Sequence, residues 1–354
     1  MKITEYLFGD DLSLDRRSFL RLSGLMGLGV ASTCLVPVAA EAVKFDSKGF
    51  KVSRTRLGIG TVVSMTLIHS SRDQAEEVMG LAFEEIDRLT GLMNRFDQSS
   101  AVGHLNKEGQ LRDLPPEVVY VIERSLYYNR LTEGAFDVTV KPVVDLFAEK
   151  MGGEKKAIPT EKELTELLRL IGSQKMELKG NSVSFKVPGM GITLDGIAKG
   201  YIVDRACEVL ARHHIDNYLV SAAGEIRAFG SRGDHKPWTV AIQDPLKRKN
   251  YPDVVEMRDG AISTSGNYEC FFDEEKMFHH IVDPSTAHSP HFSTSVSIMA
   301  RSNIESDAIA TGLFVMPPAK GVELIESLPQ CECLIIDTKG TLTRSKGWKK
   351  SATA

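Results

Sequence analysis

Two side-chain oxygens lie one helical turn apart near the C-terminal end of the sequence. Residues 306–311 read SDAIAT, so Asp307 and Thr311 stand at positions i and i+4, which lie on one face of a helix. A hard divalent cation prefers oxygen ligands of this kind. The same spacing also occurs in ordinary exposed pairs on solvated helices. The pattern therefore indicates either a cation site or an exposed polar pair.

A second segment combines small residues with a lysine at a predicted helix start. Residues 193–201 read TLDGIAKGY, at the point where a strand is expected to pass into a helix. Backbone amides at a helix N-terminus bind phosphate well, and the ammonium of Lys199 adds positive charge. The spacing is not that of the common P-loop. A capped helix start without a ligand remains the alternative.

An acid and two histidines complete the set of groups that could do chemistry. Asp137 lies in a strand-like run, residues 134–140, where it could cap a turn or contact a ligand. His279 and His280 are adjacent in a predicted strand, so their rings should point to opposite faces and one at most should face a site. Imidazole exchanges protons near neutral pH, although either ring could equally be a structural side chain.

Periodicity predicts the elements that position these groups. Apolar residues at steps of three and four predict a helix that begins after Ser70-Ser71, a second from Pro115-Pro116 to Gly134, and others at residues 160–171, 197–212 and 304–315. Strands are expected at residues 61–68, 182–187, 218–221, 238–243, 280–282 and 294–300. The polar residues 145–160 read as a linker or surface excursion.

The order of these elements predicts the fold class. Strands in runs, with helices set apart from them, favour an α+β fold with a mixed, largely antiparallel sheet and flanking helices. A strict alternation of strand and helix is not seen. The 354 residues are enough for one large or two modest domains, each with its own core.

Composition excludes several classes of protein. Hydrophobic residues make up 42% and charged residues 25%, which is typical of a soluble globular protein. The net charge of -4 provides no basic surface for nucleic acid, so no nucleic-acid partner is expected. The cysteines show no zinc-ligand spacing. Cys207, Cys270, Cys331 and Cys333 are therefore predicted to be buried thiols.

The N-terminus reads as an export signal. Arg16-Arg17 followed by Ser-Phe-Leu is typical of a twin-arginine signal, and residues 22–38 are weakly apolar and rich in glycine. That stretch is short for a membrane span, although an uncleaved anchor is the alternative. Ala40-Glu41-Ala42 has the pattern of a cleavage site. We therefore expect a signal at residues 1–42, and a periplasmic or otherwise exported mature chain without a stable membrane span.

The ordered set of motifs resembles the FAD:protein FMN transferase family, also called the ApbE family. The matching segments are GT at 60–61, LMNRF at 92–96, GAFD at 134–137, GIAKG at 196–200, GE at 224–225, TSG at 264–266, HIVDP at 280–284 and SDAIAT at 306–311. They span most of the mature chain. The resemblance implies one domain over residues 43–354 with two lobes, FAD held between the lobes, and Mg²⁺ at the FAD pyrophosphate.

The resemblance also implies roles for single residues. It makes the side chains of Asp307 and Thr311 and the carbonyl of Gly196 the metal ligands, and His280 the general base. It places contacts to FAD at Ile59, Phe96, Ala135, Phe136, Asp137, Thr193, Lys199 and Val282. Four places depart from the family's pattern: Ile59 replaces a usual Met, Thr193 a common Asp, Ala222-Ala223-Gly224 stands where a Gly-Gly pair is usual, and Ala287 stands where many members have Gly.

The implied activity is transfer of the FMN half of FAD to a protein. The hydroxyl of a Thr or Ser in an exported acceptor flavoprotein would form a phosphoester bond with FMN, and AMP would be released. Two alternatives stay open. Water could replace the acceptor, which would make the chain an FAD pyrophosphatase that releases FMN and AMP, or the chain could bind FAD without turnover.

Overall fold

The computed structural model describes the backbone of residues 41–44 and, in full, residues 49–152, 157–246, 251–268, 270–273 and 277–348. The predicted twin-arginine motif and the apolar stretch after it lie outside these residues. Within them, no helix has both the length and the apolar character needed to cross a membrane. The predicted division into two lobes stays a prediction.

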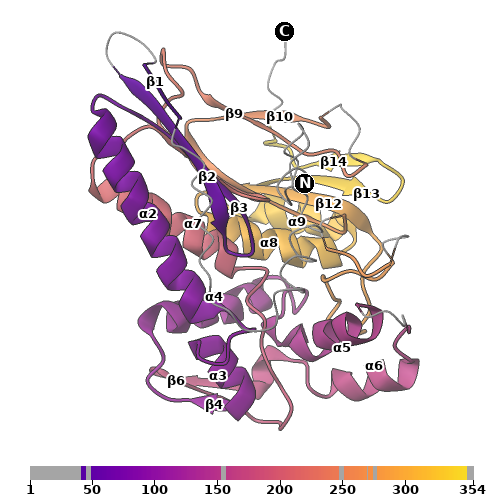
Figure 1. Ribbon diagram of the computed structural model, residues 1–354. Coiled ribbons are helices and arrows are strands. Elements are labelled where there is room, and N and C mark those ends of the chain that lie inside the picture. The colour runs from indigo at the N-terminus through magenta and orange to yellow at the C-terminus, as the bar shows by residue number, and fades with distance from the viewer. Residues whose placement is uncertain are drawn as a thin grey trace, which may run out of the picture. The chain divides into compact units, whose positions relative to one another are not determined.

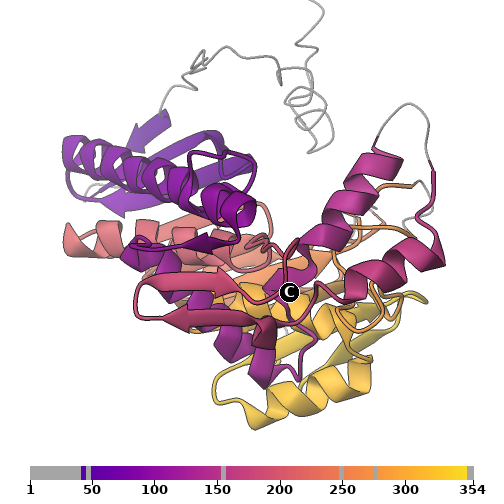
Figure 2. The same ribbon diagram turned by 90° about the horizontal axis from the view of Figure 1, so that it is seen from below.

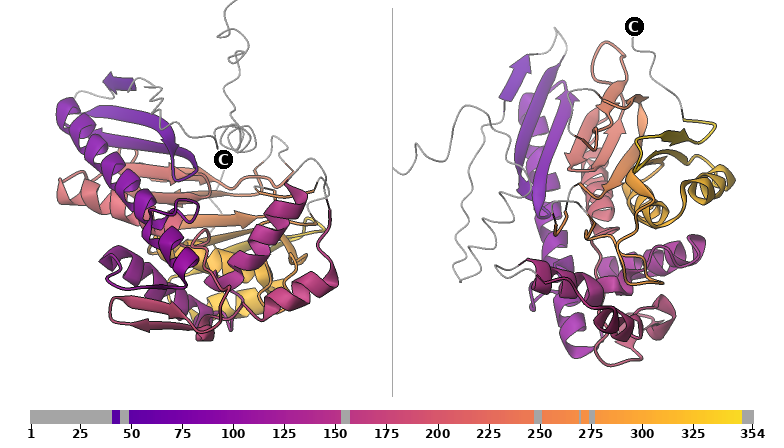
Figure 3. Two further views of the ribbon diagram at one scale, coloured as in Figure 1. Left: turned by 60° about the horizontal axis from the view of Figure 1, so that its bottom comes forward. Right: turned by 90° about the vertical axis from the view of Figure 1, so that its right-hand side faces the viewer.

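One large sheet forms the centre of the described chain. Its nine strands lie in the order β1-β2-β3-β7-β8-β11-β12-β13-β14, and neighbouring strands pair antiparallel throughout. The bounds are β1 Glu41–Lys44, β2 Phe50–Gly58, β3 Thr61–His69, β7 Tyr218–Ala222, β8 Glu225–Phe229, β11 Asp259–Gly266, β12 Ser293–Ala300, β13 Glu332–Asp337 and β14 Leu342–Arg344. The right-hand view in Figure 3 shows the indigo strands at one edge and the yellow strands at the other. The predicted α+β class with a largely antiparallel sheet is confirmed.

Helices cover one face of this sheet. They are α2 Arg72–Met93, α7 Ala198–Arg212, α8 Asn303–Val315 and α9 Pro318–Ser327, and they pack on successive strands from β2 to β14. Figure 1 shows α7 and α8 along the sheet, and Figure 2 shows the same layer from below. Strand residues alternate in direction. Val296 and Ile298 of β12 therefore lie in the helical core, whereas Met299 packs on the opposite face.

A small two-stranded sheet covers part of the opposite face. It consists of β9 Trp238–Ala241 and β10 Val254–Met257, which pair antiparallel. Trp238, Val240 and Trp348 are buried there against Ile262 and Leu334 of the large sheet. The central strands are consequently apolar on both faces, which explains why Ile262 and Leu334 are buried although they point away from the helices.

The remaining elements lie beyond one end of α2. They are α3 Ala101–Glu108, α4 Pro116–Leu131, η2 Val138–Val140, α5 Lys141–Met151, α6 Glu161–Leu168, η3 Ser173–Lys175, and the sheet of β4 Gln110–Leu111, β6 Ser182–Phe185 and β5 Met176–Lys179. Figure 2 shows α5 and α6 as a magenta pair set apart from α2. Phe147 of α5 is the centre of a second apolar cluster, where it contacts Phe272 and Phe278.

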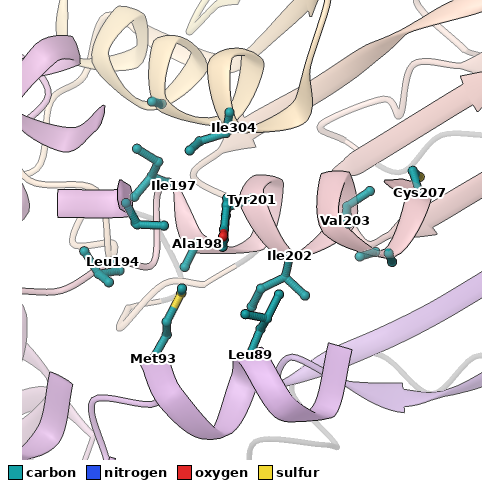
Figure 4. Close-up of a cluster of buried hydrophobic side chains, with 14 of the residues drawn as sticks. Leu89, Met93, Leu194, Ile197, Ala198, Tyr201, Ile202, Val203, Cys207 and Ile304 are labelled. Atoms are coloured by element: carbon teal, nitrogen blue, oxygen red, sulfur yellow. The ribbon is translucent and has the colours of Figure 1, made fainter. Parts of the chain in front are cut away.

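Helix α7 lies between α2 and α8, as Figure 4 shows. Leu89 and Met93 of α2 contact one side of α7, and Ile304 of α8 lies on the other. Helices α7 and α8 are also joined by polar contacts. Both carboxylate oxygens of Asp204 on α7 accept backbone N–H groups of α8, from Asn303 and Ile304, each at 2.8 Å. Asp204 therefore caps α8 in place of Ser302, whose side chain makes no capping bond.

The structure corrects three local predictions. Residues 280–282 form no strand; His279 makes an isolated bridge with Phe271 and the chain then becomes irregular. The strand-like run at residues 134–140 contains the 3₁₀ helix η2, because the Asp137 side chain caps it by accepting the N–H of Thr139. Residues up to Met151 of the expected linker belong to α5, whose apolar stripe packs against the second cluster.

Candidate active site

The first turn of α7 lies very close to α8. The N–H of Gly200 donates a 3.0 Å hydrogen bond to Asp307 Oδ2. A Cβ atom at position 200 would lie 2.2 Å from the carbonyl oxygen of Asn303 and 2.9 Å from Asp307 Cβ. A side chain at this position would therefore push the helices apart, so glycine is what allows the helix start in residues 193–201 to reach the Asp307 carboxylate.

Asp307 is a buried carboxylate. Only 2% of the residue is exposed, so the alternative of an exposed polar pair is wrong for it. Burial raises the pKa of Asp307, while the ammonium of Lys199 acts in the opposite direction. A carboxylate at this depth keeps its charge only where a cation stands close to it, and otherwise takes up a proton.

Thr311 and Gly196 meet next to this carboxylate. Thr311 is half-buried one turn after Asp307, and its Oγ1 lies 3.3 Å from Ser265 Oγ. A Cβ atom at position 196 would lie 2.8 Å from Thr311 Oγ1. The backbone of Gly196 therefore packs directly against the threonine hydroxyl, and two of the three predicted metal ligands are neighbours in space.

Lys199 pairs with a buried glutamate. Its Nζ lies 2.5 Å from Glu225 Oε1 and 3.9 Å from Asp307 Oδ1. Glu225 is the first residue of β8 and is 2% exposed. Lys199 thus stands in the first turn of α7 between two carboxylates that come from a strand and from another helix.

The two adjacent histidines differ in environment. His280 is half-buried, and its Nδ1 lies 2.9 Å from the carbonyl oxygen of Cys270. Because a carbonyl accepts, Nδ1 carries the proton, and the basic nitrogen of the neutral ring is Nε2. His279 is fully buried with its ring edge-on to Phe314, and burial lowers its pKa to about 3. His279 therefore stays neutral near pH 7.

The pattern of the ApbE family matches residues 59–335 of the chain. The chain belongs to the ApbE family. A relative from Vibrio cholerae named FAD:protein FMN transferase is 32% identical over 252 residues, which cover 69% of this chain and 75% of that protein. A relative of the same name from Haemophilus influenzae is 32% identical over 346 residues, which cover 94% and 98%.

Solved structures of ApbE proteins share the fold. The ApbE protein from Thermotoga maritima superposes with a TM-score of 0.76 at 28% identity, covering 84% of this chain and 97% of that chain. The flavin transferase ApbE from Vibrio cholerae superposes with a TM-score of 0.75 at 27% identity, covering 87% and 98%. The antiparallel sheet with flanking helices is therefore an ApbE-type α+β fold.

Of the residues that the ApbE resemblance assigns to FAD, Phe96 is the most exposed. Its ring is 78% exposed, and the guanidinium of Arg95 lies over it at 4.1 Å from the ring centroid. Arg95 also donates to Asp145 of α5 at 2.7 Å and to Asp195 at 3.1 Å. An exposed aromatic ring held by a fixed cation is suited to stacking on a planar ligand.

Asp137 is occupied by contacts within the protein. Its oxygens accept hydrogen bonds from Asn129, from Thr139 and from both the N–H and the hydroxyl of Ser173. These contacts agree with the alternative in which Asp137 caps a turn. A contact between Asp137 and FAD stays a prediction. Phe136 before it is 3% exposed and its N–H donates to Thr132 Oγ1, while Ala135 is partly buried.

The other assigned positions lie in different surroundings. Ile59 stands with Gly60 at the tip of the β2–β3 hairpin, where both have positive φ, 54° and 67°. That geometry is a type I′ turn, which strains a β-branched residue.

Thr193 is 8% exposed and its Oγ1 accepts the N–H of Asp195. Val282 is 4% exposed within the second apolar cluster, so a ligand would meet its backbone more readily than its side chain.

The donor set at α8 fits Mg²⁺. Asp307 offers a carboxylate, Thr311 a hydroxyl and Gly196 a backbone carbonyl next to that hydroxyl. All three groups carry the hard oxygen atoms that Mg²⁺ prefers. Among the described residues, no group of three or more His, Cys, Asp or Glu side chains could hold a metal ion. A site that relies on one carboxylate would therefore need further oxygens from its ligand or from water, as Mg²⁺ commonly uses.

Sequence reasoning missed the residues that connect these parts. Glu225 was matched within a motif, but its ion pair with Lys199 was not foreseen. Arg95 and Asp204 were given no role, although each joins separate elements. An acid directly after the small residues 222–224, and an arginine directly before a phenylalanine at residues 95–96, are patterns that could have singled out Glu225 and Arg95.

Proposed function

We propose that the chain is a Mg²⁺-dependent FAD:protein FMN transferase. It would cleave the FAD pyrophosphate, join FMN by a phosphoester bond to a Thr or Ser hydroxyl of an acceptor flavoprotein, and release AMP. Membership of the ApbE family and the names of the relatives support the flavin transfer. The single observation that supports the Mg²⁺ and phosphate chemistry is the buried Asp307 carboxylate, which accepts the Gly200 N–H at the start of α7 and lies beside Lys199.

The start of α7 would bind the phosphates. The positive end of the α7 helix dipole and the Lys199 ammonium would offer positive charge where negative charge develops during phosphoryl transfer. Asp307, Thr311 and the Gly196 carbonyl would hold Mg²⁺, which when bound offsets the charge of the pyrophosphate. Phe96, backed by Arg95, would stack on the flavin ring.

His280 would take the proton of the acceptor hydroxyl. As that oxygen bonds to the FMN phosphorus, the phosphorus–oxygen bond to AMP breaks and AMP leaves with the bonding electron pair. The Cys270 carbonyl fixes the proton of His280 on Nδ1, so Nε2 accepts the transferred proton. His279 would not substitute, because its ring is fully buried and its Nε2 lies 3.2 Å from the carbonyl oxygen of Pro290.

Product analysis tests this function. The full chain would be incubated with FAD, Mg²⁺ and a purified exported apo-flavoprotein, with chelator in place of Mg²⁺ as the control. Intact mass should show one FMN added to the acceptor, and chromatography should show an equal amount of AMP. Free FMN without an adduct would indicate the pyrophosphatase instead, and unchanged FAD would indicate a binding protein.

We also propose that the chain is exported in folded form. Arg16-Arg17 and the apolar residues 22–38 support this proposal. Cleavage after Ala42 would divide β1, which begins at Glu41, so two residues of the edge strand would be lost. Replacing both arginines by lysine should leave the precursor in the cytoplasm, as cell fractionation would show. Unchanged processing of that double variant would point to another route or to a retained anchor.

A further inference from the structure

The contacts of Lys199 with its two carboxylates are unequal. The 2.5 Å contact with Glu225 Oε1 is a short charge-assisted hydrogen bond, whereas 3.9 Å to Asp307 Oδ1 exceeds hydrogen-bond range. Side-chain exposure is 19% for Lys199 and 3% for each acid. At this depth water screens the charges weakly, so the placement of the ammonium strongly affects the potential at Asp307.

Glu225 is held in place by a constrained turn. β7 and β8 are joined by Ala223 and Gly224, with Ala222 paired to Glu225. The N–H of Thr264 on β11 donates to the Gly224 carbonyl at 3.1 Å, and a Cβ atom on Gly224 would lie 2.6 Å from the Thr264 carbonyl oxygen. The position of the Glu225 carboxylate is therefore set by three neighbouring strands.

The carboxylate of Glu225 is only partly satisfied. Its Oε2 is buried and has no hydrogen-bond partner within the described part of the chain. A buried carboxylate with an unpaired oxygen is unfavourable, and its ion pair with the Lys199 ammonium offsets part of that cost. What glutamate adds over glutamine at this position is its negative charge.

We infer that Glu225 is a positioning residue that draws Lys199 away from Asp307 and so leaves the Asp307 carboxylate able to bind a divalent cation. Without the charge of Glu225, the ammonium of Lys199 would turn to Asp307, which among the described residues is the other carboxylate within 4 Å, and would compete with the cation there. The identity of the cation as Mg²⁺ rests on the proposed function. The arrangement also keeps the ammonium at the helix start, where a phosphate would meet it.

The test compares cation binding in three variants. Binding of Mg²⁺ and of Mn²⁺ to the full chain without FAD would be measured by titration calorimetry for Glu225→Gln, Lys199→Met and the double variant. Glu225→Gln should bind at least tenfold more weakly than the parent. Lys199→Met should bind as tightly as the parent or more tightly, because the competing charge is gone.

The double variant decides between roles for Glu225. If Glu225 acts through Lys199, removing the lysine as well should restore cation binding to at least the parent's strength. A double variant as weak as Glu225→Gln would show that Glu225 is itself a ligand, which overturns the inference. Equal affinity of the parent and Glu225→Gln would overturn it too, and so would a parent that binds neither cation.

Two controls keep the result interpretable. Glu177→Gln removes one acid of an exposed pair with Lys179 and should leave cation binding unchanged. Melting curves without metal should show that Glu225→Gln is fully folded at the temperature of the titration, so weaker binding would not reflect unfolding. FMN transfer by the parent is measured separately, so a failure of this inference is distinct from a failure of the proposed function.

Discussion

The N–H of Gly200 on α7 donates a 3.0 Å hydrogen bond to Asp307 Oδ2 on α8, which places the start of one helix against the buried carboxylate of the other. Asp204 makes a second connection one turn further along α7, where its carboxylate caps α8. Burial raises the pKa of Asp204 to about 6. The separation of the two helices is therefore fixed near the candidate metal site by hydrogen bonds from backbone N–H groups to side-chain carboxylates, as well as by apolar packing.

Adding a methyl group at Gly200 should separate the helices. Its Cβ would lie 2.2 Å from the Asn303 carbonyl, so Gly200→Ala should lower the free energy of unfolding by about 1–3 kcal/mol and weaken cation binding. Gly80→Ala in α2 is the control, because nothing lies within 4 Å of that position and alanine favours helix. Gly80→Ala should therefore raise the free energy of unfolding. Urea unfolding of both variants tests the contrast.

Neutralising Asp307 should abolish transfer without harming the fold. In Asp307→Asn the amide oxygen can still accept the Gly200 N–H, and the cost of burying a charge disappears. We expect a melting temperature no lower than the parent's, no calorimetric binding of Mg²⁺, and loss of FMN transfer. Turnover equal to that of the parent at low Mg²⁺ would exclude Asp307 as a ligand.

The two histidines should respond differently to the same substitution. His280→Asn removes the basic Nε2 and should lower single-turnover FMN transfer about 10²-fold or more, with FAD affinity changed far less. His279→Asn should lower stability while the chemical step keeps its pH dependence. If the effects are exchanged, His279 is the base; if neither variant loses transfer, imidazole is not the base.

Acid should destabilise the protein through His279. Its pKa is about 3 when folded, against 6.5 for an ordinary histidine, because burial disfavours the charged ring. The unfolded chain therefore binds the proton first, and stability present above pH 6.5 is lost as the pH falls, by up to about 1.4 kcal/mol per pH unit. In His279→Gln this slope should become shallower between pH 6 and pH 4 (roughly the window between the two pKa values). Parallel curves for parent and variant would contradict the burial effect.

Two alanines at places where the sequence departs from the ApbE pattern both have positive φ, 58° at Ala223 and 61° at Ala287. Ala223 is exposed, so Ala223→Gly should relieve backbone strain and raise the free energy of unfolding by about 1 kcal/mol. Ala287 is fully buried, so its change to glycine also loses packing and should be close to neutral. Ala148→Gly on the exposed face of α5 is the control and should destabilise by about 1 kcal/mol. Thermal unfolding distinguishes the three.

Local patterns in the sequence were enough to predict the α+β class and most elements. The helix behind Ser71, the helix opened by Pro116 and the strand that begins at Thr61 follow from periodicity, caps and β-branched residues, which act over a few positions. The motifs that indicated the ApbE family are also short runs of neighbouring residues, so they could be read from the sequence. Where periodicity was weak, at residues 280–282 and 145–151, the predictions were wrong because tertiary packing decided the backbone.

The tertiary structure decided the electrostatics of the candidate site. The spacing of Asp307 and Thr311 allowed either an exposed pair or a cation site, and burial against α7 removes the first of these for Asp307. The pairing of Lys199 with Glu225 joins residues 26 positions apart, and the fork of Arg95 reaches Asp195, 100 positions away. Such contacts depend on which strands and helices become neighbours, and no local pattern encodes the depth at which a charge is buried.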